Sequence, residues 1–596
     1  MTAADVTNAQ CDPALPQLTV LSEEGWTDAV RSFLDGRKDS LQLLDALVAG
    51  RHRAWRGFLD IRADSRVLCI GAGYGALAES LAQHCKQLCV VDPLTARLKF
   101  LEQRRAIFAP EADIELVQAG ARGRLPFDDG RFDAVVLAEP ELVDDPAAFA
   151  GELRRLLRAQ GQLFLIADNR FSLALPRGPW DRWPGPLAGL ARGAALAARW
   201  WRGDNGARSL AGLRRGLAFT GFGHLAAYGL WPARQQFDEI LPLREGHRVS
   251  GQSGARSWKQ RLKRRSFFLP AYCVVAQAGG DRRCSTYDRI FAAAAGQLTG
   301  DPAALPLQAW RHIMTRKDKM VVQARQAENE VILRIPFAAA AAEAEARHAS
   351  ALQRLERTHP GLAPRLLAEG SVDGIGYRVE TALPGQPLRR ALAQHGPKEA
   401  LVRVEGLLET MNPSAALRVA PLAEDSYARL VEARLQRLDP FVRDRERRGR
   451  LRNYFRERLY GLPLPFGLVH GDFSASNIYL AGEAAGMVDW EAADFDDLPI
   501  LDAIGYLESA LRPMFPRRSL AESFHALAQW NLPEGLEERF LVARYEKLGI
   551  DRRYHSALVY LRWLRQIDHL VPYWLRYDPR GQDRYIHEVI HTLLRG

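Results

Sequence analysis

The feature that most constrains this chain is a short polar segment from His470 to Asn477, with Asp472 inside it and a further carboxylate, Asp489, twelve residues after Asn477. Asp472 can act as a base, whereas Asn477 and Asp489 can bind a cation through oxygen. The turn-like residues 481–483 place Asp489 on the next strand. Phosphoryl transfer is accelerated mainly by positioning and by Mg²⁺-based neutralisation of charge. The spacing therefore predicts a phosphoryl-transfer site, with a solvated loop and a buried ion pair as the alternative.

This pattern, H-x-D-x-x-x-x-N followed by V-D-W, resembles the aminoglycoside phosphotransferase and choline kinase family over roughly the C-terminal half of the chain. The resemblance implies an α+β, protein-kinase-like domain of two lobes that uses ATP. By it, Asp472 is the catalytic residue that orients the acceptor hydroxyl and takes its proton, and Asn477 and Asp489 are the Mg²⁺ ligands. His470 would brace the loop. Asp502 would open a helix and tie it back to the catalytic loop.

The nucleotide-binding side of this domain is expected upstream. Residues 331–336 read as a strand and residues 338–355 as a helix, because alanine is the strongest helix former. In the family a cation on that strand holds the ATP phosphates and pairs with a glutamate of the helix. Arg334 and Glu345 match these roles best, with Glu343 as the close competitor. Arginine replaces the usual lysine, and its fixed guanidinium suits bidentate phosphate binding.

Two further segments bear on nucleotide binding. Residues 378–381, which include Glu380, resemble the hinge that reads adenine through backbone groups. The hairpin 314–323 contains no glycine where many kinases have a flexible loop over the phosphates, and it carries hydroxyl and cationic side chains from Thr315 to Lys319 instead. This departure leaves open a kinase-like module that binds a ligand without catalysis.

The first half of the chain carries a different pattern. An apolar run ends in a turn that contains Gly71, Gly73 and Gly75, and a helix is expected over 76–84. A second apolar run ends at Asp92, 21 residues after Gly71. A strand, a glycine turn and a helix let backbone N–H groups approach a ligand closely, and an acidic side chain at this distance binds ribose hydroxyls.

Strands and helices continue to alternate after this point. The expected elements are strands at 114–117, within 125–137 and at 161–168, a helix at 146–158, and then a helix at 209–222 before strands at 226–230 and 267–277. Alternating strands and helices predict a doubly wound parallel sheet. The last two strands are typical of an antiparallel end to such a sheet.

The glycine turn alone is compatible with either NAD or S-adenosylmethionine. Dinucleotide sites generally have G-x-G-x-x-G, whereas this turn reads G-x-G-x-G. Together with the Leu-Pro-Phe segment at 125–127, it makes residues 50–280 resemble class I S-adenosylmethionine-dependent methyltransferases, which implies a Rossmann-like α/β domain. The resemblance implies that Gly71, Gly73 and Gly75 shape the methionine side of the cofactor pocket.

By the same resemblance Asp92 binds the ribose, and Ala121 stands where an acidic residue often touches adenine. No catalytic residue is assigned to the methyltransferase. Glu139 and Asp168 fall at the carboxyl ends of strands, where open α/β sheets place their sites, and either can hold or deprotonate an acceptor. A structural role in a helix cap or a turn explains each of these two residues equally well.

Chain length agrees with several domains, because 596 residues exceed the size at which a single core stops growing. We expect an N-terminal helical extension at 1–50, a methyltransferase domain at 51–280 and a kinase-like domain at 281–596. Within the last, the N-lobe is expected at about 305–382 and the C-lobe at about 383–596.

Cysteine usage and the N-terminus indicate a cytoplasmic protein. The six cysteines show no paired C-x-x-C spacing, so neither a disulfide framework nor a zinc site is expected. Residues 1–10 lack the basic start and apolar core of a signal peptide. The cytoplasm also holds both donors, ATP and S-adenosylmethionine.

The net charge of +10 raises the question of an anionic partner. The excess arginine is spread along the chain without a nucleic-acid module, so nucleic acid is not the expected partner. Two basic, tryptophan-containing segments, 186–202 and 256–265, can contact an inner membrane surface or a lipid-linked sugar, although exposed basic helices over a pocket explain them more simply. Neither segment is suited to a transmembrane span.

The combined prediction is a bifunctional enzyme that methylates with S-adenosylmethionine and phosphorylates an alcohol with ATP and Mg²⁺. The acceptor is a small molecule, a sugar, or a glycolipid or polysaccharide. Two alternatives stay open: a methyltransferase fused to a non-catalytic kinase-like binding module, and an enzyme that modifies an antibiotic or RNA.

Overall fold

The computed structural model describes residues 50–169 apart from 72, 121–122, 140–141 and 144–145; residue 172; residues 209–243 apart from 233 and 235–236; and residues 269–279, 283–315, 317–390, 397–442, 444–511, 519–530, 535–577 and 579–594. The expected N-terminal extension, except Gly50, and the basic segments 186–202 and 256–265 lie outside these residues. The chain forms two compact units, 1–341 with 368–379, and 342–367 with 380–596. The domain boundary at 280, which follows the family resemblances, stays a prediction.

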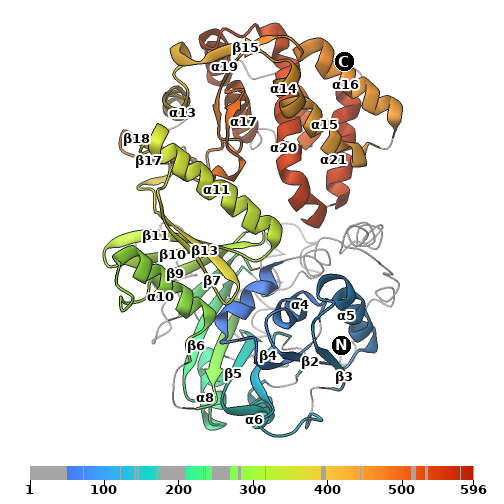
Figure 1. The fold of residues 1–596 in the computed structure, drawn as a ribbon, viewed down its shortest axis with the longest axis vertical. Helices are drawn as coiled ribbons and strands as arrows, with labels where there is room; N and C mark the ends of the chain where they lie inside the picture. Colours follow the sequence, from blue (N-terminus) through green and yellow to red (C-terminus); the bar gives the residue numbers. More distant parts are fainter. Residues whose placement is uncertain are drawn as a thin grey trace, which may run out of the picture. The chain divides into compact units, whose positions relative to one another are not determined.

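The first unit is built on a long mixed sheet (Figure 1). Among the described residues its strands follow one another in the order β12-β13-β11-β10-β9-β7-β6-β8-β5-β4-β1-β2-β3. The strands are β1 (Arg66–Ile70), β2 (Gln87–Asp92), β3 (Ile114–Gln118), β4 (Phe132–Leu137), β5 (Leu157–Asp168), β6 (Leu225–Trp231), β7 (Glu239–Leu243), β8 (Ala271–Gln277), β9 (Gln308–Met314), β10 (Lys319–Gln326), β11 (Asn329–Pro336), β12 (Leu366–Val372) and β13 (Ile375–Thr381). The first two residues of β12 and the last two of β13, which include Glu380, belong to the second unit. The helices that accompany them are η2 (Gly50–Phe58), α4 (Ala76–Ala82), α5 (Thr95–Phe108), α6 (Pro146–Leu156), α8 (Leu210–Phe219) and α10 (Thr286–Thr299).

The part of this sheet from β1 to β5 is the expected doubly wound fold. All four pairings within the order β5-β4-β1-β2-β3 are parallel. β1 and β2 are almost entirely buried, and strands covered on both faces read as continuous apolar runs. One boundary differs from expectation: α6 ends at Leu156, and β5 begins at Leu157, which pairs with Phe132 of β4. Beyond β5, strands β8 and β6 are antiparallel, as predicted.

The sheet continues without a break from the methyltransferase-like strands into the kinase-like ones. β7 pairs antiparallel with β9, with Ile240 opposite His312. Arg311 of β9 forms an ion pair of 2.9 Å with Glu239 of β7, and the His312 ring nitrogen Nδ1 is 3.2 Å from the Ile240 carbonyl. The Phe58 ring of η2 packs edge-on against Tyr287 of α10. Sequence patterns did not predict this junction, because strands 70 residues apart show no signal of their pairing.

This continuity makes a testable prediction about fragments. A separate 281–596 fragment would lose the β7 partner of β9 and the packing of Phe58 on Tyr287, and burial of one such ring contributes about 1.5–3 kcal/mol. We expect this fragment to aggregate through the edge of β9 or to unfold at a much lower temperature than the full chain. Co-expression with residues 1–280 should restore stability. A fragment that alone melts like the full chain in calorimetry would contradict a structural role for the junction.

The second unit is mostly helical and carries two small sheets, ordered β14-β17-β18 and β15-β16-β19. Its strands are β14 (Gln386–Pro387), β15 (Arg418–Pro421), β16 (Pro463–Val469), β17 (Ile478–Ala481), β18 (Ala484–Met487) and β19 (Asp494–Asp497). Its helices are α11 (Ala339–Thr358, from residue 342 onward), α13 (Pro397–Met411), α14 (Glu424–Tyr427), α15 (Ala433–Leu438), α16 (Arg445–Leu459), α17 (Ile500–Leu511), α18 (Leu520–Ala528), α19 (Leu536–Lys547), α20 (His555–Tyr577) and α21 (Pro579–Leu593).

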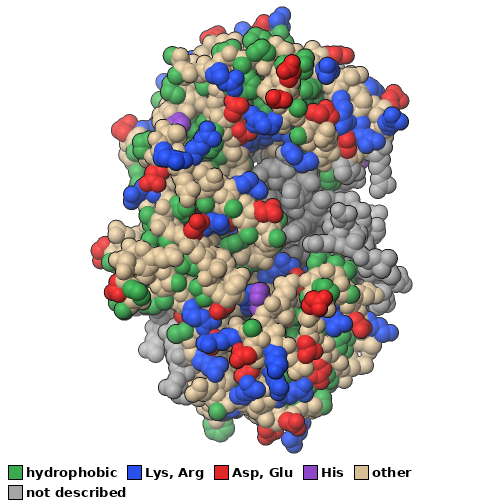
Figure 2. All heavy atoms as spheres, in the orientation of Figure 1, with side chains coloured by type: hydrophobic (Ala, Val, Ile, Leu, Met, Phe, Trp, Pro, Cys, Tyr) green, Lys and Arg blue, Asp and Glu red, His purple; other side chains and the backbone are tan. Residues whose placement is uncertain are grey.

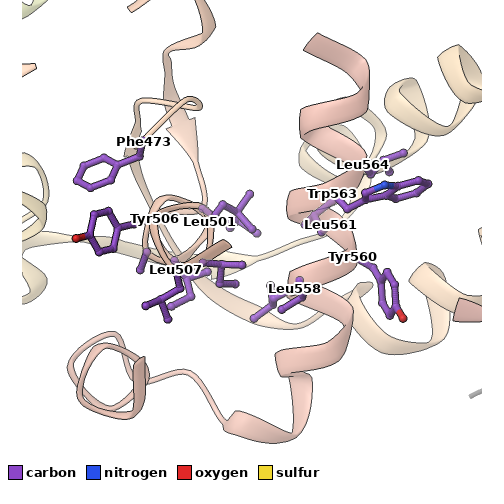
Figure 3. Packing of buried hydrophobic residues seen from close by; sticks show 14 of the residues in the cluster. Phe473, Leu501, Tyr506, Leu507, Leu558, Tyr560, Leu561, Trp563 and Leu564 are labelled. Carbon is purple, nitrogen blue, oxygen red and sulfur yellow. The ribbon is translucent and has the colours of Figure 1, made fainter. Parts of the chain in front are cut away.

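The core of the second unit lies beneath the loop that follows β16. Side chains of α17 and α20 pack together there, and Phe473 of the loop points toward Tyr506 of α17 (Figure 3). The two rings are edge-on, with centroids 6.4 Å apart. Phe473 therefore anchors the polar segment of the sequence motif to a rigid support.

The described residues show a mixed surface charge and helices of ordinary polarity. Basic and acidic side chains are interspersed on the face shown in Figure 2. None of the helices within the described ranges combines the length and apolar character that crossing a bilayer requires. Cys69, Cys85, Cys89, Cys273 and Cys284 all have free thiols.

Candidate active sites

The first candidate site lies at the carboxyl edge of the parallel strands. β1 is flanked by β2 on one side and by β4 on the other, so the strand order reverses beside it. Open α/β sheets bind ligands in the crevice outside the carboxyl ends of the strands at such a point. The glycine turn follows β1, Asp92 ends β2, and Glu139 lies two residues after β4. The topology thus brings these groups to one edge.

The glycine turn needs glycine for two reasons. Gly71, Gly73 and Gly75 have φ angles of 96°, 50° and 83°, and residues other than glycine rarely adopt this region of backbone conformation. Space is also short, since a Cβ on Gly73 would lie 2.8 Å from Glu139 Oε1, and one on Gly75 would lie 2.7 Å from Arg104 Cδ. The backbone N–H of Gly71 donates to the Val91 carbonyl, which fixes the turn against β2.

Asp92 lies in a cluster of three charged groups that sequence reasoning did not predict. Its Oδ1 accepts a hydrogen bond of 2.9 Å from the Leu94 N–H, and its Oδ2 is 3.5 Å from Arg97 Nη1. The same Arg97 nitrogen is 2.7 Å from Glu139 Oε2. Burial opposes the charged form of Arg97, but Glu139 and Asp92 outweigh it, so the pKa of the guanidinium lies above its ordinary value. The sequence indicates Glu139 only as a residue at a strand end, and Arg97 gives no signal in its helix.

The second candidate site is the loop after β16. Asn477 Nδ2 donates to Asp472 twice, to its backbone carbonyl at 2.9 Å and to its carboxylate Oδ2 at 3.0 Å. Asn477 thereby orients the carboxylate, and Asp472 and Asn477 are both half-buried. The hairpin β17–β18 then returns the chain, and the Val488 N–H donates to the Asn477 carbonyl. The predicted turn at 481–483 is this hairpin, and it brings the backbone next to Asp489 against the loop.

Asp489 directly follows Val488 and is half-buried, with a φ of 68°. Aspartate is among the few residues other than glycine that adopt this conformation at low cost. Asn477 and Asp489 offer amide and carboxylate oxygens, the donor types that Mg²⁺ prefers. No group of three or more His, Cys, Asp or Glu able to hold a metal occurs among the described residues. A Mg²⁺ ion held by one or two protein ligands together with substrate phosphates fits this donor set.

The loop is braced from both sides. Asp502 of α17 accepts the backbone N–H groups of His470 at 2.6 Å and Gly471 at 3.0 Å, and burial raises the pKa of this carboxyl. His470 Nδ1 accepts from the Asp472 N–H, and Nε2 donates to the Val488 carbonyl at 2.9 Å. Burial lowers the pKa of His470, in keeping with this neutral tautomer. The bracing roles predicted for His470 and Asp502 agree with these contacts.

A buried histidine that the sequence did not single out joins two parts of the second unit. His348 of α11 is 2.6 Å, through Nε2, from the carboxylate of Glu380. Its Nδ1 accepts the Trp490 N–H at 3.1 Å, directly after Asp489. The side chain of Glu380, the predicted hinge residue, is therefore buried against His348. A histidine in an alanine-rich helix gives no sequence signal of such a bridge.

Of the remaining predicted nucleotide-binding residues, Arg334 lies on β11 of the first unit and is buried. Glu345 of α11 is fully buried, whereas its competitor Glu343 is exposed. The pairing of Arg334 with Glu345 stays a prediction. In the glycine-free hairpin, Thr315 Oγ1 donates to the Lys319 carbonyl and accepts from the Lys317 N–H. A threonine hydroxyl thus closes this turn.

Gly471 provides a stability prediction for the loop. Its φ is 86°, and a Cβ there would lie 2.0 Å from Arg565 Nη1 and 2.5 Å from the Ala492 carbonyl oxygen. Gly471→Ala should lower the free energy of unfolding by about 2 kcal/mol or more, because strain and contact add. Gly482→Ala is the matched control, with a φ of 61° and open space around its Cβ. If urea unfolding gave the same loss of unfolding free energy for both variants, the contact with Arg565 would have no effect on stability.

Comparison with known proteins matches two regions of the chain. A model of the methyltransferase domain matches residues 68–165, and a model of the phosphotransferase enzyme family matches residues 318–539. An uncharacterized methyltransferase of Mycobacterium tuberculosis is 34% identical over 108 residues, which are 18% of this chain and 42% of that protein. A ubiquinone biosynthesis O-methyltransferase of Xanthomonas oryzae pv. oryzae is 35% identical over 123 residues, 19% of this chain and 48% of that protein.

The chain therefore spans less than half the length of these curated relatives. Among solved structures, the N-methyltransferase NodS from Bradyrhizobium japonicum, in complex with S-adenosyl-L-homocysteine, is 19% identical with a TM-score of 0.24, over 42% of this chain and 96% of NodS. The predicted fold classes and families are confirmed by the two domain matches. The chain combines a Rossmann-like methyltransferase domain with a kinase-like domain of the phosphotransferase enzyme family.

Proposed function

We propose that the protein is a bifunctional enzyme. It transfers a methyl group from S-adenosylmethionine to an oxygen or nitrogen of an acceptor, and it transfers the γ-phosphoryl group of ATP to an alcohol. The observation that carries the kinase half is the pair of contacts from Asn477 Nδ2 to Asp472, which orients the carboxylate. A loop that is merely solvated has no need for that orientation or for the support of Asp502 beneath it.

In the phosphoryl transfer, the Asp472 carboxylate accepts the proton of the acceptor hydroxyl while the oxygen attacks the γ-phosphorus in line. The bond between the γ-phosphorus and the β,γ-bridging oxygen breaks, and ADP leaves. The Asn477 amide keeps Asp472 Oδ2 engaged, so Oδ1 is the oxygen available to the acceptor. Asn477, through its Oδ1, and Asp489 would hold Mg²⁺, which supplies charge neutralisation on the phosphates. Arg334 and the backbone at Glu380 are proposed to bind the phosphates and the adenine.

The choice of S-adenosylmethionine over NAD is supported by Glu139. Its carboxylate lies against the glycine turn, 2.8 Å from the position of a Cβ on Gly73. In dinucleotide sites an anionic pyrophosphate approaches the turn closely, and here it would meet a cluster in which two carboxylates, Glu139 and Asp92, share one guanidinium, that of Arg97. S-Adenosylmethionine brings a sulfonium and an ammonium group instead, which a carboxylate attracts. Asp92 is proposed to bind the ribose hydroxyls.

The acceptor is proposed to be a small molecule, a sugar, or a glycolipid or polysaccharide, because the loop resembles that of phosphotransferases that act on alcohols. The test is to incubate the full chain with both donors and a panel of sugars, lipid-linked sugars, aminoglycosides and choline-like alcohols. Mass spectrometry should reveal a gain of a phosphoryl group, and of a methyl group on the same or a related acceptor. RNA is tested beside this panel. Nucleotide binding without transfer of a phosphoryl group to any of these acceptors would favour a non-catalytic kinase-like module.

A further inference from the structure

Arg97 contacts both carboxylates of the first candidate site, Asp92 and Glu139. It is in the first turn of α5, and its Nη1 is 3.5 Å from Asp92 Oδ2 and 2.7 Å from Glu139 Oε2. The side chains of Arg97 and Asp92 are 7% and 0% exposed, and that of Glu139 is 22% exposed. The arginine thus spans from the end of β2 to the loop after β4, across the glycine turn that both carboxylates flank.

The carboxylate proposed to bind ribose is therefore occupied in this structure. Asp92 Oδ1 accepts the Leu94 N–H, and Oδ2 faces Arg97. The Asp92 side chain has no exposed surface, so ribose hydroxyls reach it only after groups around it move, and the Arg97 guanidinium is one of these groups. A buried guanidinium between two carboxylates is held firmly, because leaving either carboxylate unpaired is costly.

The charges explain how a ligand can displace this arginine. Two carboxylates and one guanidinium leave the cluster with one net negative charge, and removal of Arg97 leaves two. S-Adenosylmethionine carries a sulfonium, an ammonium and a carboxylate, so it brings one net positive charge to replace the one that departs. We infer that Arg97 is an internal competitor of the cofactor, which pairs with Asp92 and Glu139 in the free protein and leaves Asp92 when S-adenosylmethionine binds.

This inference rests on the proposed cofactor and predicts a gain of affinity from a loss of contacts. When only a fraction of the protein is competent to bind, the apparent Kd is the intrinsic Kd divided by that fraction. Arg97→Met, which keeps length and removes charge, should therefore tighten S-adenosylmethionine binding about tenfold or more. Arg97→Lys should give a smaller gain, because a compact ammonium reaches one carboxylate rather than two.

The control and the stability readout separate competition from a structural role. Lys99→Met removes the same charge from an exposed position on α5 and should leave the Kd unchanged. Without ligand, Arg97→Met should melt at a lower temperature than wild type, because two carboxylates lose their partner. In Arg97→Met the affinity for S-adenosylmethionine then rises while the melting temperature falls. If Arg97 had only a structural role, both the affinity and the melting temperature would fall.

Calorimetric titration of the full-length wild type and of the three variants with S-adenosylmethionine tests the inference. Tighter binding of S-adenosylmethionine by Arg97→Met than by wild type supports the inference. If Arg97→Met does not fold, a higher affinity of Arg97→Lys than of wild type supports it instead. Equal or weaker binding by the folded Arg97 variants overturns the inference and leaves the proposed cofactor intact. If neither wild type nor any folded variant binds S-adenosylmethionine, the proposed cofactor is wrong and the inference fails with it.

Discussion

Asp472→Asn should reduce phosphoryl-transfer turnover by about 10²–10⁴-fold, the usual contribution of a positioned general base. The change keeps the shape of the side chain, and an asparagine oxygen can still accept the hydrogen bond that Asn477 Nδ2 now donates to Oδ2. The affinity for Mg²⁺·ATP should stay nearly unchanged, because Asp472 is proposed to contact the acceptor rather than the metal. Turnover and nucleotide affinity, measured side by side on the full chain, check this separation.

Two variants sharpen this prediction. Asp496→Asn removes an exposed carboxylate that pairs with Arg418 and Arg429, and it should leave turnover unchanged. Asp489→Asn should chiefly weaken nucleotide binding in the presence of Mg²⁺, because a carboxylate ligand is lost. Asparagine is preferred to alanine at this position, since it also tolerates a φ of 68°. If Asp472→Asn retained wild-type turnover, Asp472 would not be the base.

Gly73→Val should abolish S-adenosylmethionine binding. The φ of 50° is strained for a branched side chain, and the added Cβ would lie 2.8 Å from Glu139 Oε1, within the turn proposed to hold the methionine side of the cofactor. Calorimetry on the full chain is the measurement. Retained Mg²⁺·ATP binding by the same sample would show that the protein is folded.

The matched control for Gly73→Val is Gly130→Val. Gly130 has a φ of 65° with nothing within 4 Å of its Cβ position, so it carries the same backbone strain without the contact. Gly130→Val should lose some stability and keep its affinity for the cofactor. Equal loss of binding in both variants would attribute the effect to strain alone and remove the glycine turn from the site.

The sequence predicted those parts of the structure that local pattern determines. The apolar runs before Gly71 and Asp92 became buried parallel strands, because strands covered on both faces need apolar residues throughout. The turn at 481–483 became the β17–β18 hairpin, and Asp502 contacts the loop as the resemblance implied.

Three features escaped prediction because they depend on contacts between distant segments. Pairing of β7 with β9 joins strands that no local signal connects. Arg97 approaches Asp92 and Glu139 only after β2 and β4 have been brought to either side of β1. His348 reaches Glu380 and Trp490 across the second unit, and a histidine on a helix carries no sequence mark of its partners.

The central claim is that one chain holds a methyltransferase site and a kinase site, each with its own donor. Titration of the full-length protein with S-adenosylmethionine, with NAD and with Mg²⁺·ATP tests it most directly. We expect one site for S-adenosylmethionine, one for Mg²⁺·ATP whose affinity is lower in Asp489→Asn, and no heat from NAD. Binding of NAD without S-adenosylmethionine, or no nucleotide binding in the presence of Mg²⁺, would contradict the claim.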